Sequence, residues 1–196
     1  METTDKKNIL NEFFNIENEA LRQSLESIMT VQVFRIGENI VEAGKKQKYI
    51  YFNMTGIFRE YYIDQNDKEI TEFFGMKRGA SVNSWNALDG ESKIGIQAIT
   101  KVTVIAFPVA EINELAQRFP EIYIFCCQLL KQRLDWNWKL KKIHYQLTAM
   151  EKYQWFLEEF PDLEYYVRSK DIASFLQFSS VSLSRIRKEI WENKQT

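Results

Sequence analysis

The chain has 196 residues, of which 45% are hydrophobic and 27% are charged, and its formal net charge is −1. This composition excludes a disordered or fibrous chain and leaves room for one ordinary domain plus a smaller second one. Because the overall charge is close to zero, any surface that binds a polyanion must be local.

The sequence indicates a cytoplasmic protein with no membrane partner. Residues 1–16 are polar and acidic, unlike a signal peptide. No run of about 18 uncharged apolar residues, as a membrane span requires, occurs in the chain. Cys126 and Cys127 are adjacent in a helical pattern, so we expect reduced, buried thiols and no disulfide framework.

The amino-terminal two thirds combine short helices with many short strands. Residues 6–29 carry apolar side chains at helical spacing, interrupted near Asn15, which predicts one or two amphipathic helices. Short β-branched and aromatic runs separated by turn signals then predict strands at 31–34, 39–42, 49–53, 57–63, 69–74, 94–99 and 102–107. Many strands of this length predict an α+β chain whose β domain is a double-stranded β-helix, or jelly roll.

Helical periodicity returns after Pro108. A short helix is predicted at 109–118, and a long one follows Pro120. Steps of four and three residues along the long helix, typical of a coiled-coil seam, join Ile122, Cys126, Leu129, Arg133, Trp136, Leu140, Ile143 and Leu147. The sequence therefore predicts a homodimer through this helix, the alternative being that the stripe packs on its own β domain. A further helix is predicted at 148–160.

Residues 169–188 have the pattern of a helix-turn-helix. Ser169 is predicted to cap the first helix, and Ser179 or Ser180 the second. A shared core between two crossing helices is predicted for Ile172, Ala173, Leu176, Phe178, Leu183 and Ile186. Gln177 occupies a turn position where glycine is commoner, so a positive φ is expected there. The alternative is a helical hairpin that only packs.

The outward face of the second helix suits entry into the DNA major groove. Small residues allow close approach, and the Arg185 guanidinium can bond two acceptors on guanine. Phosphate contacts are predicted for Ser169, Lys170, Arg187 and Lys188. The complete set of predicted DNA-binding residues is Ser169, Lys170, Ser180, Val181, Ser182, Ser184, Arg185, Arg187 and Lys188.

The order of these parts resembles the Crp/Fnr family of bacterial transcription regulators. In the roll the resemblance depends on Phe34, Gly37, Glu38, Ile40, Gly44, the run 50–52 and Gly56, and near the carboxy terminus on 170–176 and 182–188. It implies a cyclic-nucleotide-binding-like roll with flanking helices at 1–118, a dimerisation helix at 119–147 and a helix-turn-helix domain at 148–196. It also implies two recognition helices in successive major grooves of double-stranded DNA, and RNA polymerase as a further partner.

The resemblance fails where the family binds cyclic nucleotides. Such members carry a Gly-Glu pair for the ribose and an Arg-Ser pair for the phosphate. Here Ala80 and Ser81 follow Gly79, and the second pair falls on Ser92 and Lys93, which lacks the arginine fork. We therefore expect no ordinary cyclic-AMP site. Two alternatives stay open: a scaffold without ligand, or an unknown small-molecule effector near Ser81, Asn83, Trp85, Ser92 and Lys93.

Other sensory chemistry and catalysis find little support. Two cysteines are too few for an iron-sulfur cluster, and a lone His144 does not indicate heme, so no cofactor is expected. No metal-ligand spacing or nucleophile motif predicts an enzyme. Members of the family usually continue into a β-hairpin wing, whereas only residues 191–196 follow Ile190, so we expect a wingless branch that depends on its recognition helices for affinity. The alternative function is a ligand-binding signalling module whose carboxy-terminal helices contact proteins.

Overall fold

The protein is a mixture of helices and antiparallel strands. A computed structural model describes residues 3–84 and 90–193. The chain divides into two compact units, the first formed by Met1–Phe58 and Gly75–Leu130 and the second by Arg59–Phe74 and Lys131–Thr196. The β domain predicted from the sequence therefore contributes strands to both units.

Two antiparallel strand sets build the first unit. The strands are β1 (Thr30–Phe34), β2 (Asn39–Val41), β3 (Tyr49–Thr55), β6 (Gly95–Ala98) and β7 (Val102–Pro108). β7 lies between β1 and β3, with Thr30 opposite Ala106 and Ile50 opposite Phe107. β2 pairs with β6. β7 is the central strand of its sheet, which explains why its side chains from Val102 to Phe107 are almost all buried.

Helices pack on this unit around one hydrophobic core. They are α1 (Thr3–Phe14), α2 (Glu19–Ile28), α3 (Val109–Arg118) and the beginning of α4 (Glu121–Gln146). Asn18 is the N-cap residue of α2, because its side-chain oxygen accepts hydrogen bonds from the backbone N–H groups of Ala20 and Leu21 at 3.1 and 3.2 Å. Leu21 and Leu25 are then buried against the sheet residues Phe52, Ile105 and Phe107.

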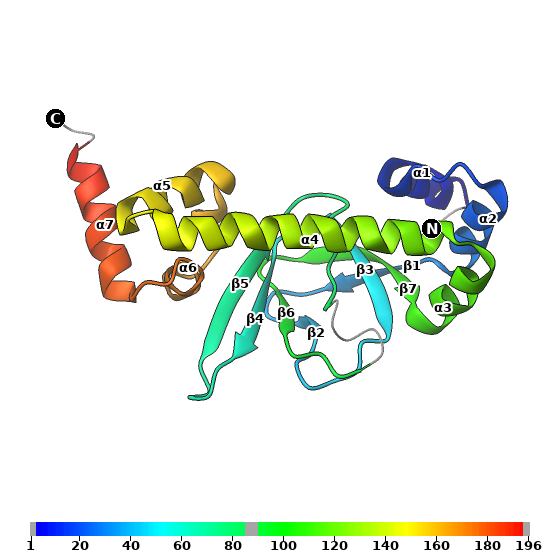
Figure 1. The fold of residues 1–196 in the computed structure, drawn as a ribbon, viewed down its shortest axis with the longest axis horizontal. Coiled ribbons are helices and arrows are strands. Elements are labelled where there is room, and N and C mark those ends of the chain that lie inside the picture. The colour runs from blue at the N-terminus through cyan, green and yellow to red at the C-terminus, as the bar shows by residue number, and fades with distance from the viewer. Residues whose placement is uncertain (1–2, 85–89, 194–196) are drawn as a thin grey trace. The chain divides into compact units, whose positions relative to one another are not determined.

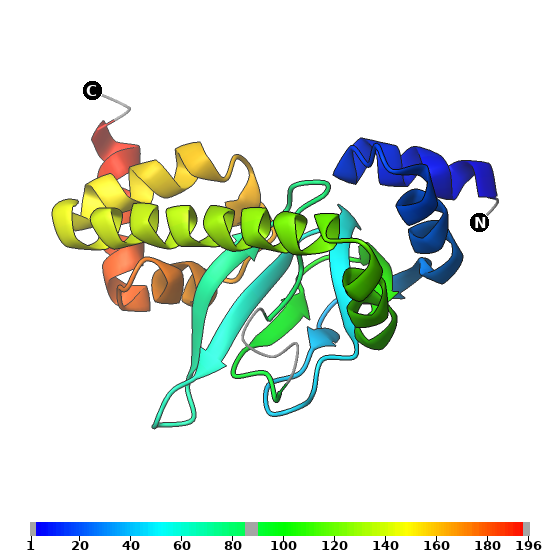
Figure 2. The same cartoon turned by 45° about the vertical axis from the view of Figure 1, so that its right-hand side comes forward.

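The second unit combines β4 (Phe58–Ile63) and β5 (Glu69–Gly75) with the carboxy-terminal helices. These are the end of α4, α5 (Ala149–Glu159), a 3-10 helix (Leu163–Tyr165), α6 (Ser169–Phe175) and α7 (Ser180–Asn193). Figure 2 shows α5, α6 and α7 gathered around the end of α4. Their core is aromatic: the Phe74 and Phe175 rings lie 5.2 Å apart, and Phe156 and Phe160 5.5 Å apart.

Local sequence signals and observed elements agree closely. All seven predicted strands are present, and the predicted interruption near Asn15 separates α1 from α2, with Asn15 in the left-handed region at φ 43°. The predicted helix after Thr148 is α5, which starts with a reciprocal pair of hydrogen bonds between Thr148 and Glu151. Among the described helices, none is both long enough and apolar enough to span a membrane.

The predicted coiled-coil residues of α4 lie on the face that packs against the chain itself. Figure 1 shows α4 as one continuous helix. Ile122, Leu140 and Ile143 are buried, and Arg133 pairs with the buried Glu60 carboxylate at 2.5 Å. The indole ring of Trp136 packs on Phe73 of β5. Cys126 and Leu129 pack against the core of the first unit, and Leu147 is half-buried.

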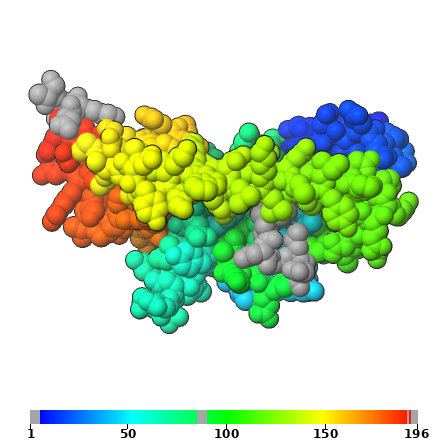
Figure 3. All heavy atoms as spheres, viewed as in Figure 1, coloured from blue at the N-terminus to red at the C-terminus, as the bar shows by residue number. Residues whose placement is uncertain are grey.

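A second apolar set lies on the exposed side of the same helix. It consists of Tyr123, Ile124, Leu130, Leu134, Trp138 and Tyr145, which we call the α4 stripe. Leu134 and Trp138 are each 60% exposed. In Figure 3 the yellow-green atoms of α4 form an uncovered band. Exposed apolar side chains that recur at helical spacing indicate a contact surface.

Candidate nucleic-acid interface

α6 and α7 form a tightly packed helix pair. Ile172, Leu176 and Leu183 are fully buried, and Ala173 is 2% exposed. Gln177, in the turn between the helices, has φ 61°, so the positive φ expected there is confirmed. The remaining predicted core members are also placed inward, Ile186 buried and Phe178 half-buried. This packing fixes which side of α7 is turned outward.

The amino-terminal end of α7 has a side-chain cap, whereas that of α6 has none. Ser179 caps α7, since its Oγ accepts a hydrogen bond from the backbone N–H of Ser182 at 3.0 Å, as the sequence allowed. The predicted cap of α6 at Ser169 is wrong, because Arg168 is the N-cap residue and makes no side-chain cap bond. Ser169 lies inside the first turn, where its hydroxyl is available to a different partner.

The outward face of α7 carries six of the nine residues predicted to bind DNA. The exposed members are Ser180, Val181, Ser182, Ser184, Arg185 and Lys188. Val181 is 62% exposed, at the beginning of the helix. Lys188 lies 3.7 Å from the Glu192 carboxylate, a loose pair of two exposed side chains. Within the described chain no ion pair engages Arg185, so its guanidinium is presented to solvent.

Two of the residues predicted to contact phosphate, Ser169 and Arg187, are hydrogen-bonded to each other. Arg187 Nη1 donates to the Ser169 hydroxyl at 2.7 Å, and its Nε donates to the Tyr153 hydroxyl at 3.0 Å. The Tyr153 hydroxyl in turn donates to Glu164 at 2.6 Å. Burial, together with this hydrogen bond to Glu164, raises the pKa of Tyr153. Arg187 therefore joins α7 to α5 and α6, whereas Lys170 stays exposed.

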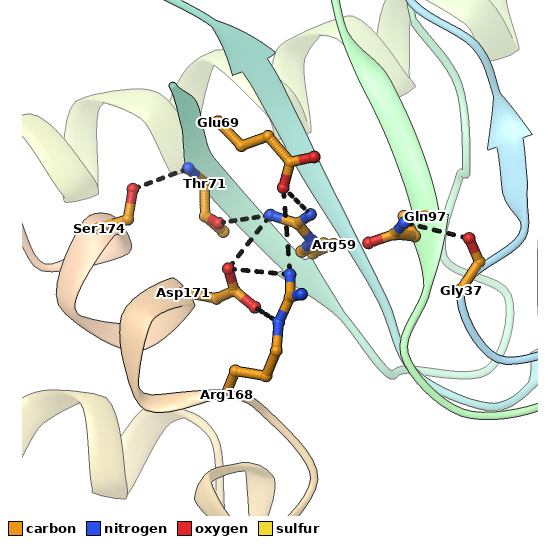
Figure 4. A network of polar contacts seen from close by, with 8 residues as sticks. All are labelled: Gly37, Arg59, Glu69, Thr71, Gln97, Arg168, Asp171 and Ser174. Carbon is orange, nitrogen blue, oxygen red and sulfur yellow. Dashed lines mark hydrogen bonds and ion pairs between the residues drawn. The ribbon is translucent and has the colours of Figure 1, made fainter. Parts of the chain in front are cut away.

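A buried ion network fixes α6 against the strands of its own unit (Figure 4). The Arg59 side chain is 1% exposed, and its Nη1 donates to Asp171 Oδ1 and Thr71 Oγ1, each at 3.3 Å. Its Nη2 pairs with Glu69. From the solvent side, Arg168 Nε donates to Asp171 Oδ2 at 2.7 Å. We call these five residues the Arg59 network.

One backbone contact supports the Arg59 network. The Thr71 N–H of β5 donates to the Ser174 hydroxyl of α6 at 3.0 Å. Burial raises the pKa of Glu69, but the hydrogen bond from Arg59 and the positive charges of Arg59, Lys170 and Arg168 together outweigh it, and the pKa is lowered. The network thus holds the first helix of the pair by two separate contacts, from Asp171 and Ser174. The sequence did not predict a role for Arg59, because its partner Asp171 lies 112 residues away and no local pattern around Arg59 indicates this pairing.

The roll positions predicted for an effector are mainly engaged in structural hydrogen bonds. The Asn83 side chain is buried and donates to the Tyr51 carbonyl and the Ser81 hydroxyl at 2.9 and 3.0 Å, while its oxygen accepts from Gln47 and the Tyr51 N–H. Ser92 is buried and donates to its neighbour, the Ile94 carbonyl, at 2.7 Å. Ser81 is half-buried, Lys93 is exposed, and Trp85 lies outside the described residues.

Comparisons with known proteins define the class of fold. No family model matches the sequence, and no curated protein matches it either. Solved structures do match. A Crp/Fnr-family transcriptional regulator from Eubacterium rectale has a TM-score of 0.74 at 15% identity, over 95% of this chain and 88% of that one. FixK2 from Bradyrhizobium japonicum has a TM-score of 0.70 at 17% identity, over 85% and 86% of the chains.

A third similar structure is that of a regulator described as responsive to c-di-GMP. The c-di-GMP responsive global regulator CLP of Xanthomonas campestris matches with a TM-score of 0.69 at 13% identity, over 90% of this chain and 93% of that one. These likenesses extend over nearly the whole chain, so it has the fold of the Crp/Fnr regulators. The resemblance expected from the sequence is therefore confirmed as a likeness of fold.

Proposed function

We propose that this chain is a sequence-specific, DNA-binding transcription regulator of the Crp/Fnr type that acts as a homodimer. The observation that carries the proposal is the outward face of α7, where small side chains precede a solvent-exposed Arg185 while Leu183 and Ile186 anchor the opposite face. Major-groove entry needs this combination, because the backbone must approach the bases before an arginine can bond guanine. The α6–α7 pair is then the helix-turn-helix, and the β strands form the jelly-roll sensor.

The second copy would contact the α4 stripe. Leu130, Leu134 and Trp138 are four residues apart and so lie on one face, which leaves them exposed on a single chain. A symmetric contact between two such helices would bury them and space the two α7 helices for a palindromic site. The roll itself lacks the residues of an ordinary cyclic-nucleotide site, and RNA polymerase contact stays a prediction from the resemblance.

DNA binding is tested by gel shift and footprinting on the protein's own upstream region, at low and at physiological salt. Arg185→Ala should weaken specific binding by roughly ten- to hundredfold, the value of one bidentate contact to guanine. Lys131→Ala, an equal loss of charge at an exposed position of α4, is the control and should change affinity little. If wild type protects no fragment at low salt, the DNA-binding proposal is refuted, and tight ligand binding without DNA binding would favour the signalling-module alternative.

Dimerisation is tested separately by light scattering during gel filtration. The mass measured by light scattering should be about twice the chain mass of 23.4 kDa for wild type. It should fall to the mass of a monomer for Leu134→Lys, because the substitution places a charge in the apolar contact. Gln132→Lys places the same charge at an exposed position of α4 outside the stripe, and should remain a dimer. A monomeric wild type, or a dimeric Leu134→Lys variant, would show that the stripe is not the contact.

A further inference from the structure

An apolar cavity of about 830 Å³ lies in the first unit, apart from the roll positions considered above. Its walls come from α2, α3, the beginning of α4, the strands β3 and β7, and the segment Phe14–Asn18 that joins α1 to α2. Small-molecule sites in proteins typically have volumes of about 300 to 1,000 Å³ and mostly apolar walls. The cavity therefore has the size and character of a site for a drug-sized molecule.

Aromatic rings form much of the wall. Phe14 packs edge to face on Phe52 at 4.8 Å and on Phe125 at 5.2 Å, and Phe107 lies 6.0 Å from Phe14. Phe52 and Phe107 are almost fully buried, so they form the floor of the cavity, whereas Phe14 and Phe125 are only partly buried. Such a wall favours a flat or extended apolar body.

The charged groups of the cavity all have one sign. Glu17 and Glu121 are among the residues that line it, and both are exposed, which places them at its mouth; no lysine, arginine or histidine is among its described lining residues. The Asn18 amide donates to Glu121 Oε1 at 2.9 Å. This hydrogen bond holds the pKa of Glu121 below its usual range, so the carboxylate is ionised at neutral pH. An anion would be repelled at this mouth, and a cation attracted.

Most of the α4 stripe lies on the side of the helix away from the cavity, and Ile124 is the stripe member that also lines the cavity. Ile122, Cys126 and Leu129 line the cavity from the side that faces the core, whereas Leu134 and Trp138 point outward. A second copy seated on Leu134 and Trp138 would therefore meet the cavity wall only near Ile124 and would leave its interior to another occupant. Because one wall belongs to α4, an occupant would also contact the helix that continues into the second unit.

We propose that this cavity binds a small apolar cation, an aromatic or long-chain amine. Its apolar body would lie among the phenylalanine rings, and its ammonium group would lie at the carboxylates of Glu17 and Glu121. The binding site stands independently of the DNA-binding proposal. Its role as the effector site of a transcription regulator rests on that proposed function.

The test uses three fluorescent probes with the same body and different heads: 1-pyrenemethylamine, 1-pyrenemethanol and 1-pyrenecarboxylate. Each is titrated into the full-length protein and followed by pyrene emission. The amine should bind at least about tenfold more tightly than the carboxylate, with the alcohol between them, as expected for a charge-assisted contact. Equal affinities, or a preference for the carboxylate, would overturn the proposal.

Matched variants locate the site. The double variant Glu17→Gln with Glu121→Gln should reduce the preference for the amine to below about threefold and leave the affinity for the alcohol unchanged. Glu111→Gln, an exposed carboxylate of α3 that does not line the cavity, should keep the full preference. If the double variant behaves as wild type, the amine binds elsewhere and the proposal fails.

Two further measurements separate other occupants and other proposals. Cys126→Trp should fill the cavity and abolish binding of all three probes, and Leu129→Phe serves the same purpose if the first variant does not fold. Probe binding that occurs only in the monomeric Leu134→Lys variant would show that a second copy occupies the cavity, contrary to the proposal. Since the titration contains no DNA, its result is independent of the gel-shift outcome.

Discussion

Replacing Asp171 by asparagine removes one of the two carboxylates that pair with the buried Arg59 guanidinium. The exposed fractions of the two side chains are 8% for Asp171 and 1% for Arg59, so the pair is shielded from solvent. Removing one partner of a buried ion pair typically costs about 3 to 5 kcal/mol, because the other charge is left uncompensated. Here Glu69 remains, with a side chain 40% exposed, so we expect the lower end, about 3 kcal/mol.

The assay is urea unfolding followed by tryptophan fluorescence, in which Trp136 and Trp155 report on the second unit. A double-mutant cycle with Arg59→Met isolates the pair, and the coupling energy should be about 1 to 3 kcal/mol. Glu159→Gln is the control, because Glu159 pairs with Lys139 at 2.5 Å near the surface and should cost less than about 1 kcal/mol.

Two results would refute this reasoning. One is an Asp171→Asn variant that loses no more stability than the surface control. The other is a cycle in which the two substitutions are additive, because residues that share one buried network should couple. Either would mean that the ion pair between Arg59 and Asp171 contributes no net stability to the packing of α6.

Two further predictions concern single residues of the same unit. Gln177→Gly should raise the free energy of unfolding by about 1 kcal/mol, since φ 61° strains a side chain but not glycine, and Gln177→Ala should give no such gain. Glu69 has a lowered pKa, so its stabilising contribution should be present above pH 4.5 and disappear as the pH falls through its folded-state pKa. Glu69→Gln should therefore differ from wild type at neutral pH and converge with it in acid; a constant difference in urea unfolding across that range would contradict the assignment.

Local chemistry was sufficient to predict most elements of the fold. The strand runs, the break near Asn15 and the left-handed turn at Gln177 all follow from short-range preferences that neighbouring residues do not override. The N-cap of α6 is Arg168, one residue before the predicted Ser169, and the Ser169 hydroxyl accepts a hydrogen bond from Arg187 across the helix pair instead. Helix boundaries depend on such tertiary contacts, which the local sequence does not contain.

The long helix illustrates a different limit. The apolar residues of α4 recur at helical spacing, but this spacing alone does not say which of its two apolar faces packs against the rest of the protein and which is exposed to solvent. Ile122 and Leu140 belong to the inner face, whose residues recur in steps of four and three, whereas Leu134 and Trp138 belong to the outer face and are themselves four residues apart. Choosing between them requires knowledge of where the core lies, and that is a property of the whole fold.

The division of positive charges on the α6–α7 pair has a consequence for recognition. Ser169 and Tyr153 hold the Arg187 side chain, and the Arg59 network holds α6. The helix pair is therefore fixed on the side opposite the exposed face of α7. Arg185, on the outward face, makes no ion pair with any described residue. A binding surface with a rigid backbone loses little backbone freedom when it binds, and an arginine that makes no ion pair has none to break first. Variants of the buried supports should therefore weaken any DNA complex through the ordering cost, without contacting the DNA themselves.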